Sequence, residues 1–446
     1  MKSIISIATA LISLIILSCI HLPIAFAGKN LTTASNTTIR IAFGSCLKPH
    51  LRPELILNRI TESNPDVFVW LGDVAYTDVT YIPFPSSPFC MFAGEEKYKA
   101  KLQETKNLPS YQRLRNSTQI VGVWDDHDYG INDGTATFKY KDITQALWLD
   151  FIDEPANSPR RKQKGIWDSY YIGKEQKIKL ILLDTRYNRN GRFFGNDTLG
   201  ETQWEWLENE FINNKAELVF IGNGYQFFPD DRVLPEHWFY ESKERLYDLM
   251  NKHKVNGVVL MSGDVHTGEI MRNPCSKLRT GYDLYEITSS GITHTIPRLM
   301  RYFWETWIPP TYHTRYHGVF QDVNFGIIDV NMTDGHVTNI SLQIRDKTGD
   351  IVREVVLPYS ALVRNESSTG GHETCVVYAK SPLRRLFEYH LTHFGNVSKT
   401  LEGKRGVIMY AMFLAIFLVG LFMMYICAYF CCYRRKNRVT KKEKLS

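Results

Sequence analysis

The chain has 446 residues, with 53 Lys and Arg against 47 Asp and Glu, giving a net charge of +6. About 44% of the residues are hydrophobic and 22% are charged, which is typical of a protein with a folded core. This composition excludes a disordered chain, a coiled coil and a collagen-like repeat. The positive charge suggests nucleic acid or an anionic membrane as a partner. The location of the basic residues along the chain decides between these two.

The amino terminus has the pattern of a secretory signal. Lys2 precedes an apolar run over residues 4–20, and Ala25-Phe26-Ala27 offers small residues at the two positions that signal peptidase inspects. We predict a signal peptide over residues 1–27, followed by a linker over 28–39. An uncleaved signal anchor is the alternative.

Short apolar segments rich in β-branched residues then alternate with amphipathic patterns. We predict strands over residues 39–43, 67–71, 120–124, 178–183, 218–221 and 258–261. We predict helices over residues 53–63, 95–115, 139–152, 201–213 and 242–254. Strands that alternate with helices indicate an α/β fold with largely parallel or mixed sheets, in which ligands bind beyond the carboxyl ends of the strands.

The end of this domain favours β-structure. Strands are predicted over residues 325–330, 338–345 and 351–357, and we place the domain over residues 40–362. Residues 302–316 are dense in aromatic side chains. They are suited to an apolar substrate wall near a bilayer or, equally, to extra core beneath a long loop.

The carboxyl terminus has the pattern of a membrane anchor. After a spacer over 363–405, residues 406–432 form 27 residues without a charge. At ~1.5 Å rise per residue, a helix of this length crosses a ~30 Å hydrocarbon core. The tail over 433–446 has seven basic residues, which marks it as cytoplasmic. Together with the signal, this predicts a single-pass type I membrane protein of the secretory pathway.

The excess positive charge therefore lies at the predicted signal and membrane span, and it reports the orientation of the chain in the membrane. The tail contributes +6, and Lys2, Lys404 and Arg405 contribute +3, so residues 28–403 carry −3. This distribution argues against nucleic acid as a partner. Lys442 and Lys444 resemble a dilysine retrieval signal for the endoplasmic reticulum, but a basic tail also gives this spacing by chance. Retention there and residence in the plasma membrane both stay open.

Glycosylation sequons agree with this topology, because all of them precede the predicted span. They begin at Asn30, Asn36, Asn116, Asn196, Asn331, Asn339, Asn365 and Asn396.

Acids and histidines follow several of the predicted strands. Asp73, Asp126, Asp264 and His266 are hard oxygen and nitrogen ligands from different strands. Two cations ~3.5–4 Å apart need a bridging carboxylate and further ligands of this kind, and they then activate water and polarise a phosphoryl oxygen. The constellation predicts a two-metal hydrolase of phosphoesters that uses a metal-bound hydroxide.

The motifs in these loops resemble those of the alkaline phosphatase D (PhoD-like) family of calcineurin-like metallophosphoesterases. They are Gly72-Asp73-Val74-Ala75-Tyr76, Trp124-Asp125-Asp126-His127-Asp128-Tyr129-Gly130 and Ser262-Gly263-Asp264-Val265-His266-Thr267-Gly268-Glu269. Supporting stretches are Phe43-Gly44-Ser45-Cys46, Leu183-Asp184-Thr185-Arg186 and Thr288-Ser289-Ser290-Gly291-Ile292-Thr293-His294. The resemblance spans about residues 40–345.

The resemblance implies a four-layer α/β/β/α sandwich with a binuclear centre bridged by Asp73. The implied ligands are Cys46, Tyr76 and Asp264 at a site for Fe³⁺, and Asp126 and His266 at a site for Ca²⁺, with other divalent ions as alternatives. His127 is the implied general acid and phosphate contact. Arg186 is expected either to clamp a phosphoryl oxygen or to form a surface salt bridge.

The sequence departs from the wider superfamily in three places. Ser45-Cys46 stands where most members have Asp-x-His, and Asp126 stands where Asn is usual. The usual His after the fifth strand is absent, and Asn223 or Gln226 is the candidate substitute. His294 either lines the site or is a structural histidine.

Cys46, Cys90, Cys275 and Cys375 face an oxidising compartment, where disulfides form. Because Cys46 ends a predicted strand beside the other motifs, we favour a metal ligand over a disulfide at this position. Our choice for the disulfide is Cys90 with Cys275.

We therefore expect a membrane-anchored phosphatase or phosphodiesterase that acts on lumenal or extracellular phosphoesters, with lipid-linked esters among the candidates. The alternative is an inactive receptor or adhesion module of the same fold. A zinc protease is disfavoured because the chain has no His-Glu-x-x-His motif.

Overall fold

The computed structural model describes residues 36–80, 90–191, 196–229, 237–296, 314–315 and 318–365. The helices and strands in these ranges belong to one compact unit. The predicted signal, most of the spacer, the membrane span, the basic tail and most of the aromatic stretch lie outside them.

The first sheet has six strands and is mixed. Its order is β15 (Ile351–Pro358), β14 (His336–Asp346), β13 (Asn324–Thr333), β1 (Asn36–Gly44), β2 (Val67–Leu71) and β5 (Gln119–Val123). Strands β1, β2 and β5 run parallel, and β13 joins them antiparallel to β1. The residues of β2 are all buried, which accounts for its unbroken apolar sequence.

The second sheet has seven strands. Its order is β12 (Thr314–Arg315), β10 (Gly268–Asn273), β11 (Leu284–Ser289), β9 (Val258–Ser262), β8 (Leu218–Gly222), β7 (Ile178–Leu182) and β6 (Asp168–Ile172). Strands β7, β8, β9 and β11 run parallel, so their carboxyl ends lie at one edge. A separate hairpin pairs β3 (Asp78–Thr80) with β4 (Cys90–Phe92).

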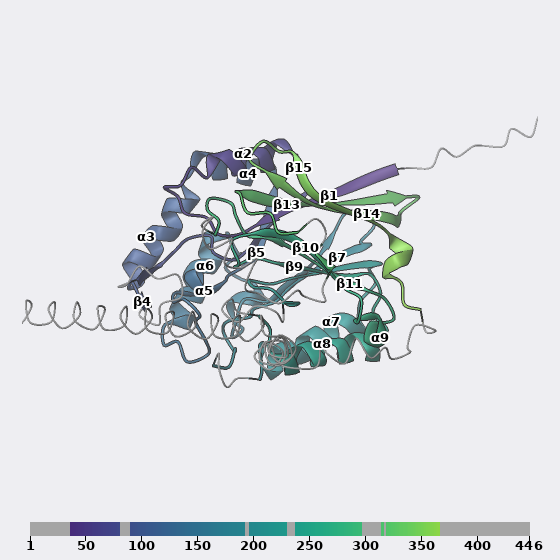
Figure 1. Cartoon of the computed structure of the whole chain (residues 1–446). Helices are drawn as coiled ribbons and strands as arrows, with labels where there is room; N and C mark the ends of the chain where they lie inside the picture. Colours follow the sequence, from purple (N-terminus) through teal and green to yellow (C-terminus); the bar gives the residue numbers. More distant parts are fainter. Residues whose placement is uncertain are drawn as a thin grey trace, which may run out of the picture. The chain divides into compact units, whose positions relative to one another are not determined.

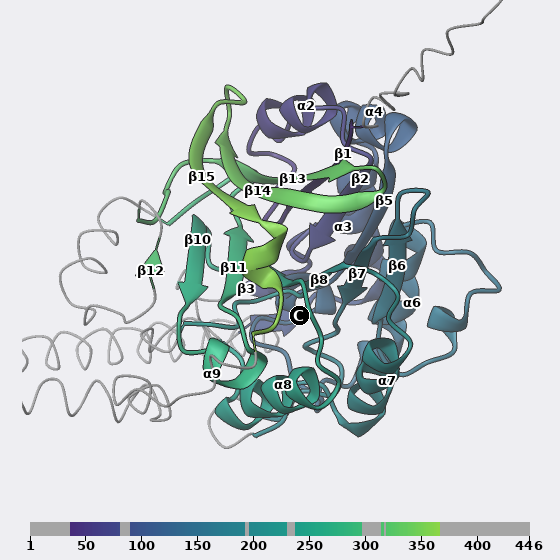
Figure 2. The ribbon, with the colours of Figure 1, turned by 90° about the vertical axis from the view of Figure 1, so that its right-hand side faces the viewer.

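Helices cover the outer side of each sheet (Figures 1 and 2). Helices α2 and α4 lie against the six-stranded sheet, and α7, α8 and α9 lie against the seven-stranded sheet. The helices are α2 (Glu54–Glu62), α3 (Glu95–Lys106), α4 (Pro109–Ser117), α5 (Asp126–Tyr129), α6 (Lys141–Phe151), α7 (Glu201–Ile212), α8 (Tyr240–Lys252) and α9 (Lys277–Thr280). The described ranges also contain two 3-10 turns, Pro159–Arg161 and Tyr359–Leu362.

The structure confirms the predicted mixed α/β fold and most of its elements. One helix predicted over 95–115 is two, because Pro109 lacks an N–H and begins α4 at its first turn. Six strands were not predicted, namely β3, β4, β6, β10, β11 and β12. The apolar pattern of β11 is interrupted by Glu286, a fully buried acid that accepts hydrogen bonds from the backbone of Phe227 and Phe228.

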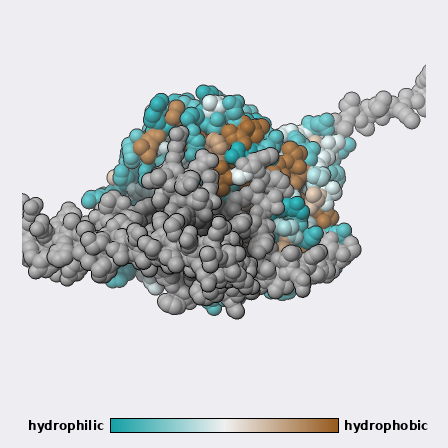
Figure 3. Space-filling view, viewed as in Figure 1, coloured by the Kyte–Doolittle hydropathy of each residue, from teal (hydrophilic) through white to brown (hydrophobic). Residues whose placement is uncertain are grey.

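The surface seen in Figure 3 is mainly hydrophilic where it belongs to described residues, with several small apolar patches. Across those residues, no helix combines the length and the apolar character needed to span a bilayer. The predicted span over 406–432 is not among them.

The loops that follow the parallel strands of the two sheets approach each other closely. A Cβ at Gly263, after β9, would lie 2.4 Å from the carbonyl oxygen of Leu71, the last residue of β2. A Cβ at Gly72 would lie 2.3 Å from the Cβ of Asp125, after β5. Glycine at position 263 lets the carboxyl ends of the two sheets meet, and glycine at position 72 lets the loops after β2 and β5 of the first sheet pack together.

We predict that Gly263→Ala destabilises the protein, because the new methyl group meets a backbone oxygen that has little room to move. The expected loss is ~1–3 kcal/mol in the free energy of unfolding, measured by urea denaturation. Gly191→Ala is the matched control, since its Cβ has no atom within 4 Å, and it should change stability by less than ~0.5 kcal/mol. Equal effects would contradict the close approach.

Candidate metal centre

The candidate ligands stand in loops where the backbone reverses directly after a buried strand. Cys46, Asp73, Asp264 and His266 all have left-handed backbone, with φ of 63°, 52°, 68° and 54°. Left-handed backbone is costly for residues other than glycine and clusters at functional sites. Here three of the four side chains, those of Cys46, Asp73 and His266, come together between the two sheets.

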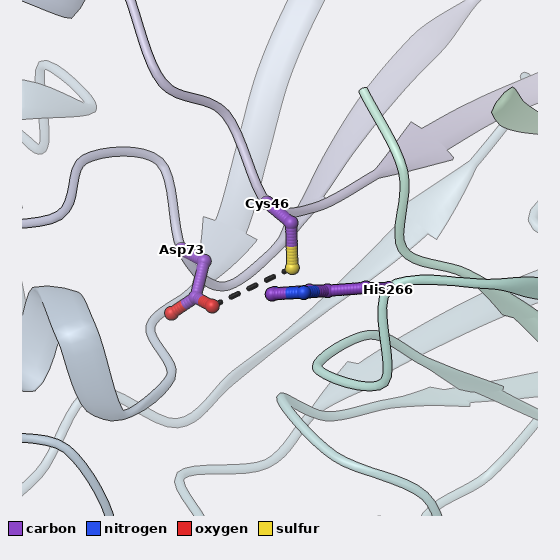
Figure 4. Close-up of side chains that lie close together, drawn as sticks. All are labelled: Cys46, Asp73 and His266. Atoms are coloured by element: carbon purple, nitrogen blue, oxygen red, sulfur yellow. Dashed lines mark hydrogen bonds between the residues drawn. The ribbon is translucent and has the colours of Figure 1, made fainter. Parts of the chain in front are cut away.

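Two groups of side chains have the spacing of metal ligands. Within each, one donor atom per residue lies within 4.8 Å of the others. The first group contains Cys46, Asp73 and His266, which converge from three loops (Figure 4). The second contains Asp73, Asp126 and His127. Asp73 belongs to both groups, which is the position expected of a bridging carboxylate.

This grouping differs from the implied ligand sets in three respects. His266 lies with Cys46, whereas the resemblance paired it with Asp126. His127, the implied general acid, lies within ligand distance of Asp73 and Asp126. Asp264 is in neither group, although its backbone oxygen is 3.7 Å from the Cys46 Sγ.

The Asp73 carboxylate is incompletely satisfied by the described protein atoms. Its Oδ2 accepts from the Cys46 thiol at 3.5 Å, and its buried Oδ1 has no hydrogen-bond partner. Burial raises the pKa of Asp73 to about 6, although nearby His127 opposes the shift. Burial raises the pKa of Asp264 well above its usual range, and repulsion from Asp125 adds to the effect.

An unsatisfied carboxylate oxygen among buried acids is the setting that a bound cation stabilises. Thiolate, carboxylate and imidazole are also suitable donors for transition metals. The residues present therefore fit metal ions.

The Cys46 thiol is free and fully buried. Its Sγ is 3.0 Å from the Ser290 hydroxyl, which also accepts from the His266 backbone N–H. Burial raises the pKa of this thiol well above its usual range, and the charge of Asp73 raises it further. A cation beside the sulfur would reverse this effect, because it stabilises the thiolate.

The Tyr76 hydroxyl lies between two histidines. It is 3.0 Å from Nε2 of His266 and 2.9 Å from Nε2 of His294, whose rings pack at 4.4 Å. Burial lowers the pKa of His266 to about 3 and that of His294 to about 2, so both rings are neutral. Neutral imidazole is the form that binds metal. The structure thus brings His294 into the site.

His127 has a carboxylate partner that the sequence reasoning missed. Its Nδ1 is 2.9 Å from Oδ1 of Asp78, whose side chain is nearly fully buried. Burial would lower the pKa of His127, but the surrounding carboxylates, led by Asp126, raise it well above its usual range. In the absence of metal these carboxylates favour the protonated ring, and Asp78 holds its orientation through Nδ1.

Arg186 forms a buried ion pair instead of the alternative surface salt bridge. Both side chains are fully buried, and Nε lies 2.7 Å from Oδ1 of Asp125. The guanidinium also packs over the ring of Tyr225 at 4.7 Å. Arg186 thus holds the turn that presents Asp126 and His127, and contact with a phosphoryl oxygen stays a prediction.

Asn223 and Gln226 make buried hydrogen bonds with the surrounding protein. The Asn223 amide donates to the carbonyl of Met261 and accepts from the Trp238 indole. Gln226 donates to Glu269 and Thr288. These bonds anchor the loop after β8. A role at the metals stays untested.

Cys275 is disulfide-bonded. The side chains of Cys90 and Cys375 lie outside the described residues, so the predicted pairing of Cys90 with Cys275 stays a prediction.

Among the sequons, Asn36, Asn116, Asn196 and Asn365 are exposed. Asn331 and Asn339 are half-buried and hydrogen-bonded to each other at 2.6 Å. Asn30 and Asn396 are outside the described ranges.

Comparison with known families gives a match to the model of the PhoD-like phosphatases over residues 55–339. The chain belongs to this family. A PhoD-like phosphatase is a metal-dependent phosphoester hydrolase, and the two ligand groups that share Asp73 agree with that chemistry. No protein of curated function matches the sequence.

Several solved structures are similar to this chain at low sequence identity, and that of PhoD shares its fold. The structure of PhoD superposes with a TM-score of 0.51 at 13% identity, covering 79% of this chain and 78% of that one. A purple acid phosphatase from yellow lupin gives 0.47 at 14% identity, covering 76% and 56%. The GAP50 anchor of the inner membrane complex of Plasmodium gives 0.46 at 11% identity, covering 77% and 96%.

We predict opposite effects of Asp73→Asn in chelated and metal-loaded protein. In chelator at pH 7.5, the variant should be more stable than the wild type by ~1–3 kcal/mol, because it loses a buried charge whose pKa is raised. After addition of Fe³⁺, Ca²⁺ or Mn²⁺, the wild type should gain stability and the variant should not. Thermal denaturation and elemental analysis measure these outcomes.

Asp322→Asn is the control, since this carboxylate is exposed and pairs with Lys347. It should behave like the wild type in both conditions. An Asp73→Asn variant that binds as much metal as the wild type would contradict the bridging role.

Proposed function

We propose that this PhoD-like phosphatase is a membrane-anchored enzyme that hydrolyses lumenal or extracellular phosphoesters at a binuclear metal centre. The observation that carries the proposal is the pair of ligand groups that share one buried carboxylate, Asp73. His127, which belongs to the second group, would supply the proton donor, and its contact with Asp78 would favour the protonated ring.

The residues around Asp73 divide the work of hydrolysis. Cys46, Asp73 and His266 would hold one ion, and Asp73 and Asp126 would hold the other. When bound, the ions supply Lewis-acid stabilisation of phosphoryl oxygen and activation of water. His127 gives its proton to the leaving alkoxide, and Asp78 keeps the ring oriented for this transfer.

The donor set guides the choice of metals. A thiolate at Cys46 and a phenolate at Tyr76 are strong anionic donors, which favour Fe³⁺ at the first site. Burial and the nearby acids raise the pKa of Tyr76 well above its usual range, so its ionisation needs a nearby cation. The carboxylate of Asp126 suits a hard ion such as Ca²⁺ at the second site.

The membrane anchor rests on sequence pattern. The signal over residues 1–27, the apolar segment over 406–432 and the basic tail together favour a type I protein of the secretory pathway. Four exposed sequons and a disulfide-bonded cysteine support an oxidising, glycosylating compartment.

We predict graded losses of activity from two substitutions around the proton donor. His127→Ala should reduce kcat for an alkyl phosphoester by ~10²–10⁴-fold, because protonation of a poor leaving group is lost. Asp78→Asn should reduce kcat less. It should also move the alkaline limb of the pH profile to lower pH, because removing this charge lowers the pKa of His127 and the acid deprotonates earlier.

The experiment uses full-length, metal-loaded protein and both mono- and diester substrates. Asp322→Asn is again the control and should match the wild type. If the wild type binds metal but hydrolyses no ester, it is the inactive receptor or adhesion module, and the proposed function is wrong. An unchanged pH profile in the Asp78→Asn variant would contradict the proposed role of Asp78 in orienting His127.

We also predict that Lys442 and Lys444 retain the protein in the endoplasmic reticulum. Changing both to Ser should move the protein to the cell surface, which imaging of a tagged full-length chain would detect. Lys436→Ser with Lys441→Ser is the matched control and should leave the location unchanged. Removal of N-glycans should increase gel mobility, and an unglycosylated chain would contradict the proposed topology.

A further inference from the structure

A cavity of about 710 Å³ lies between β4, the start of α3, the loop after α5 and the start of α6. Helices α3 and α6 pack against each other on this side of the molecule (Figure 1). The size is within the usual range of small-molecule sites.

Aromatic and aliphatic side chains form much of the cavity wall. Phe92 stacks on Tyr140 with ring centroids 4.7 Å apart, and Phe138 packs edge-on against both rings. Met91 and Ile143 also line the cavity and are 54% and 39% exposed. Exposed apolar side chains that line one concave surface are typical of a binding site for an apolar group.

The cavity is connected to the metal centre through Asp78. The backbone of Asp78 pairs with that of Phe92, which lines the cavity. One carboxylate oxygen of Asp78 binds His127, and the other accepts from the backbone N–H of Asn132, a second lining residue at 3.1 Å. Two walls of the cavity are therefore attached to the residue that orients the proton donor.

A second contact repeats this connection. The backbone N–H of Asp133, another lining residue, donates to Oδ2 of Asp126 at 2.7 Å. The loop that forms one wall of the cavity thus also holds a candidate metal ligand. The cavity wall is therefore hydrogen-bonded to the metal centre on the side of His127 and Asp126.

We propose that this cavity binds the apolar leaving group of the phosphoester substrate, so that the enzyme prefers esters of alcohols with an alkyl chain. The assignment to the leaving group rests on the proposed function. Hydrolysis breaks the bond between phosphorus and the ester oxygen, water supplies the new P–O bond, and His127 gives a proton to the departing alkoxide. The leaving alcohol would therefore lie beside His127, on the side where Asp78 and Asp126 are hydrogen-bonded to the cavity wall.

The charged residues that line the cavity are compatible with an uncharged alkyl chain as its occupant. Glu95 and Asp133 line it together with Lys139, giving two acids against one base. This balance disfavours a leaving group with a second phosphate, such as a nucleotide. Because apolar contact carries the binding, affinity should rise with the length of the chain.

The test measures binding without turnover. Methyl, butyl and hexyl phosphonate, which lack a hydrolysable ester, are titrated into full-length, metal-loaded protein in lipid nanodiscs by calorimetry. We expect about two- to fourfold tighter binding for each added methylene. Met91→Gln combined with Ile143→Gln should reduce this gain at least by half, since both side chains are exposed and their replacement leaves the core intact.

Ile212→Gln is the matched control, because Ile212 is 56% exposed on α7, away from the cavity lining. This variant should keep the full increase of affinity with chain length. Partition of the phosphonates into the nanodisc lipid would affect it and the double variant equally. Equal affinity for methyl and hexyl phosphonate in the wild type would overturn the proposal, as would full dependence in the double variant. If the dependence is present but no ester is hydrolysed, the cavity stands and the proposed function fails.

Discussion

The mutual repulsion of buried carboxylates is the constraint on which the site depends. Asp73, Asp125, Asp126 and Asp264 come from three strand ends that meet in a space largely closed to water, and several raise one another's pKa. Arg186 and His127 offset part of this charge. The rest favours cations, because removing acids from water without a counter-charge costs several kcal/mol each. The glycines at the two sheet edges, the left-handed ligand positions and the buried arginine all serve to hold these acids together.

Asp78 links the chemistry to its surroundings. One short hairpin brings its carboxylate to His127, and the same residue connects the proton donor with two walls of the apolar cavity. A change in the cavity wall can therefore reach His127 through a single hydrogen-bonded side chain. Substitutions in the cavity wall and substitutions at the proton donor are therefore expected to have non-additive effects on activity.

The sequence was sufficient for the parts of the fold that depend on local pattern. Strands buried on both faces, such as β2 and β9, have continuous apolar sequences, and the acids after them are recognisable as ligands. Strand β11 was missed because Glu286 satisfies backbone donors from a distant loop, which no local pattern reveals. Asp78 was missed for a similar reason. It lies 49 residues before His127 in the sequence, and only the folded hairpin brings the two side chains together. The partition of ligands between two groups is likewise a tertiary property.

The left-handed backbone at the ligand positions limits how this site can change. Asn, Asp and glycine tolerate such dihedrals well, whereas β-branched residues such as Thr and Val tolerate them poorly. An exchange of Asp for Asn at position 264 would alter the charge offered to a metal while keeping the turn. Replacing Cys46 by Thr would disturb the backbone before any change in metal binding mattered. The route from one metal preference to another is therefore restricted by dihedral angles as much as by the chemistry of the donors.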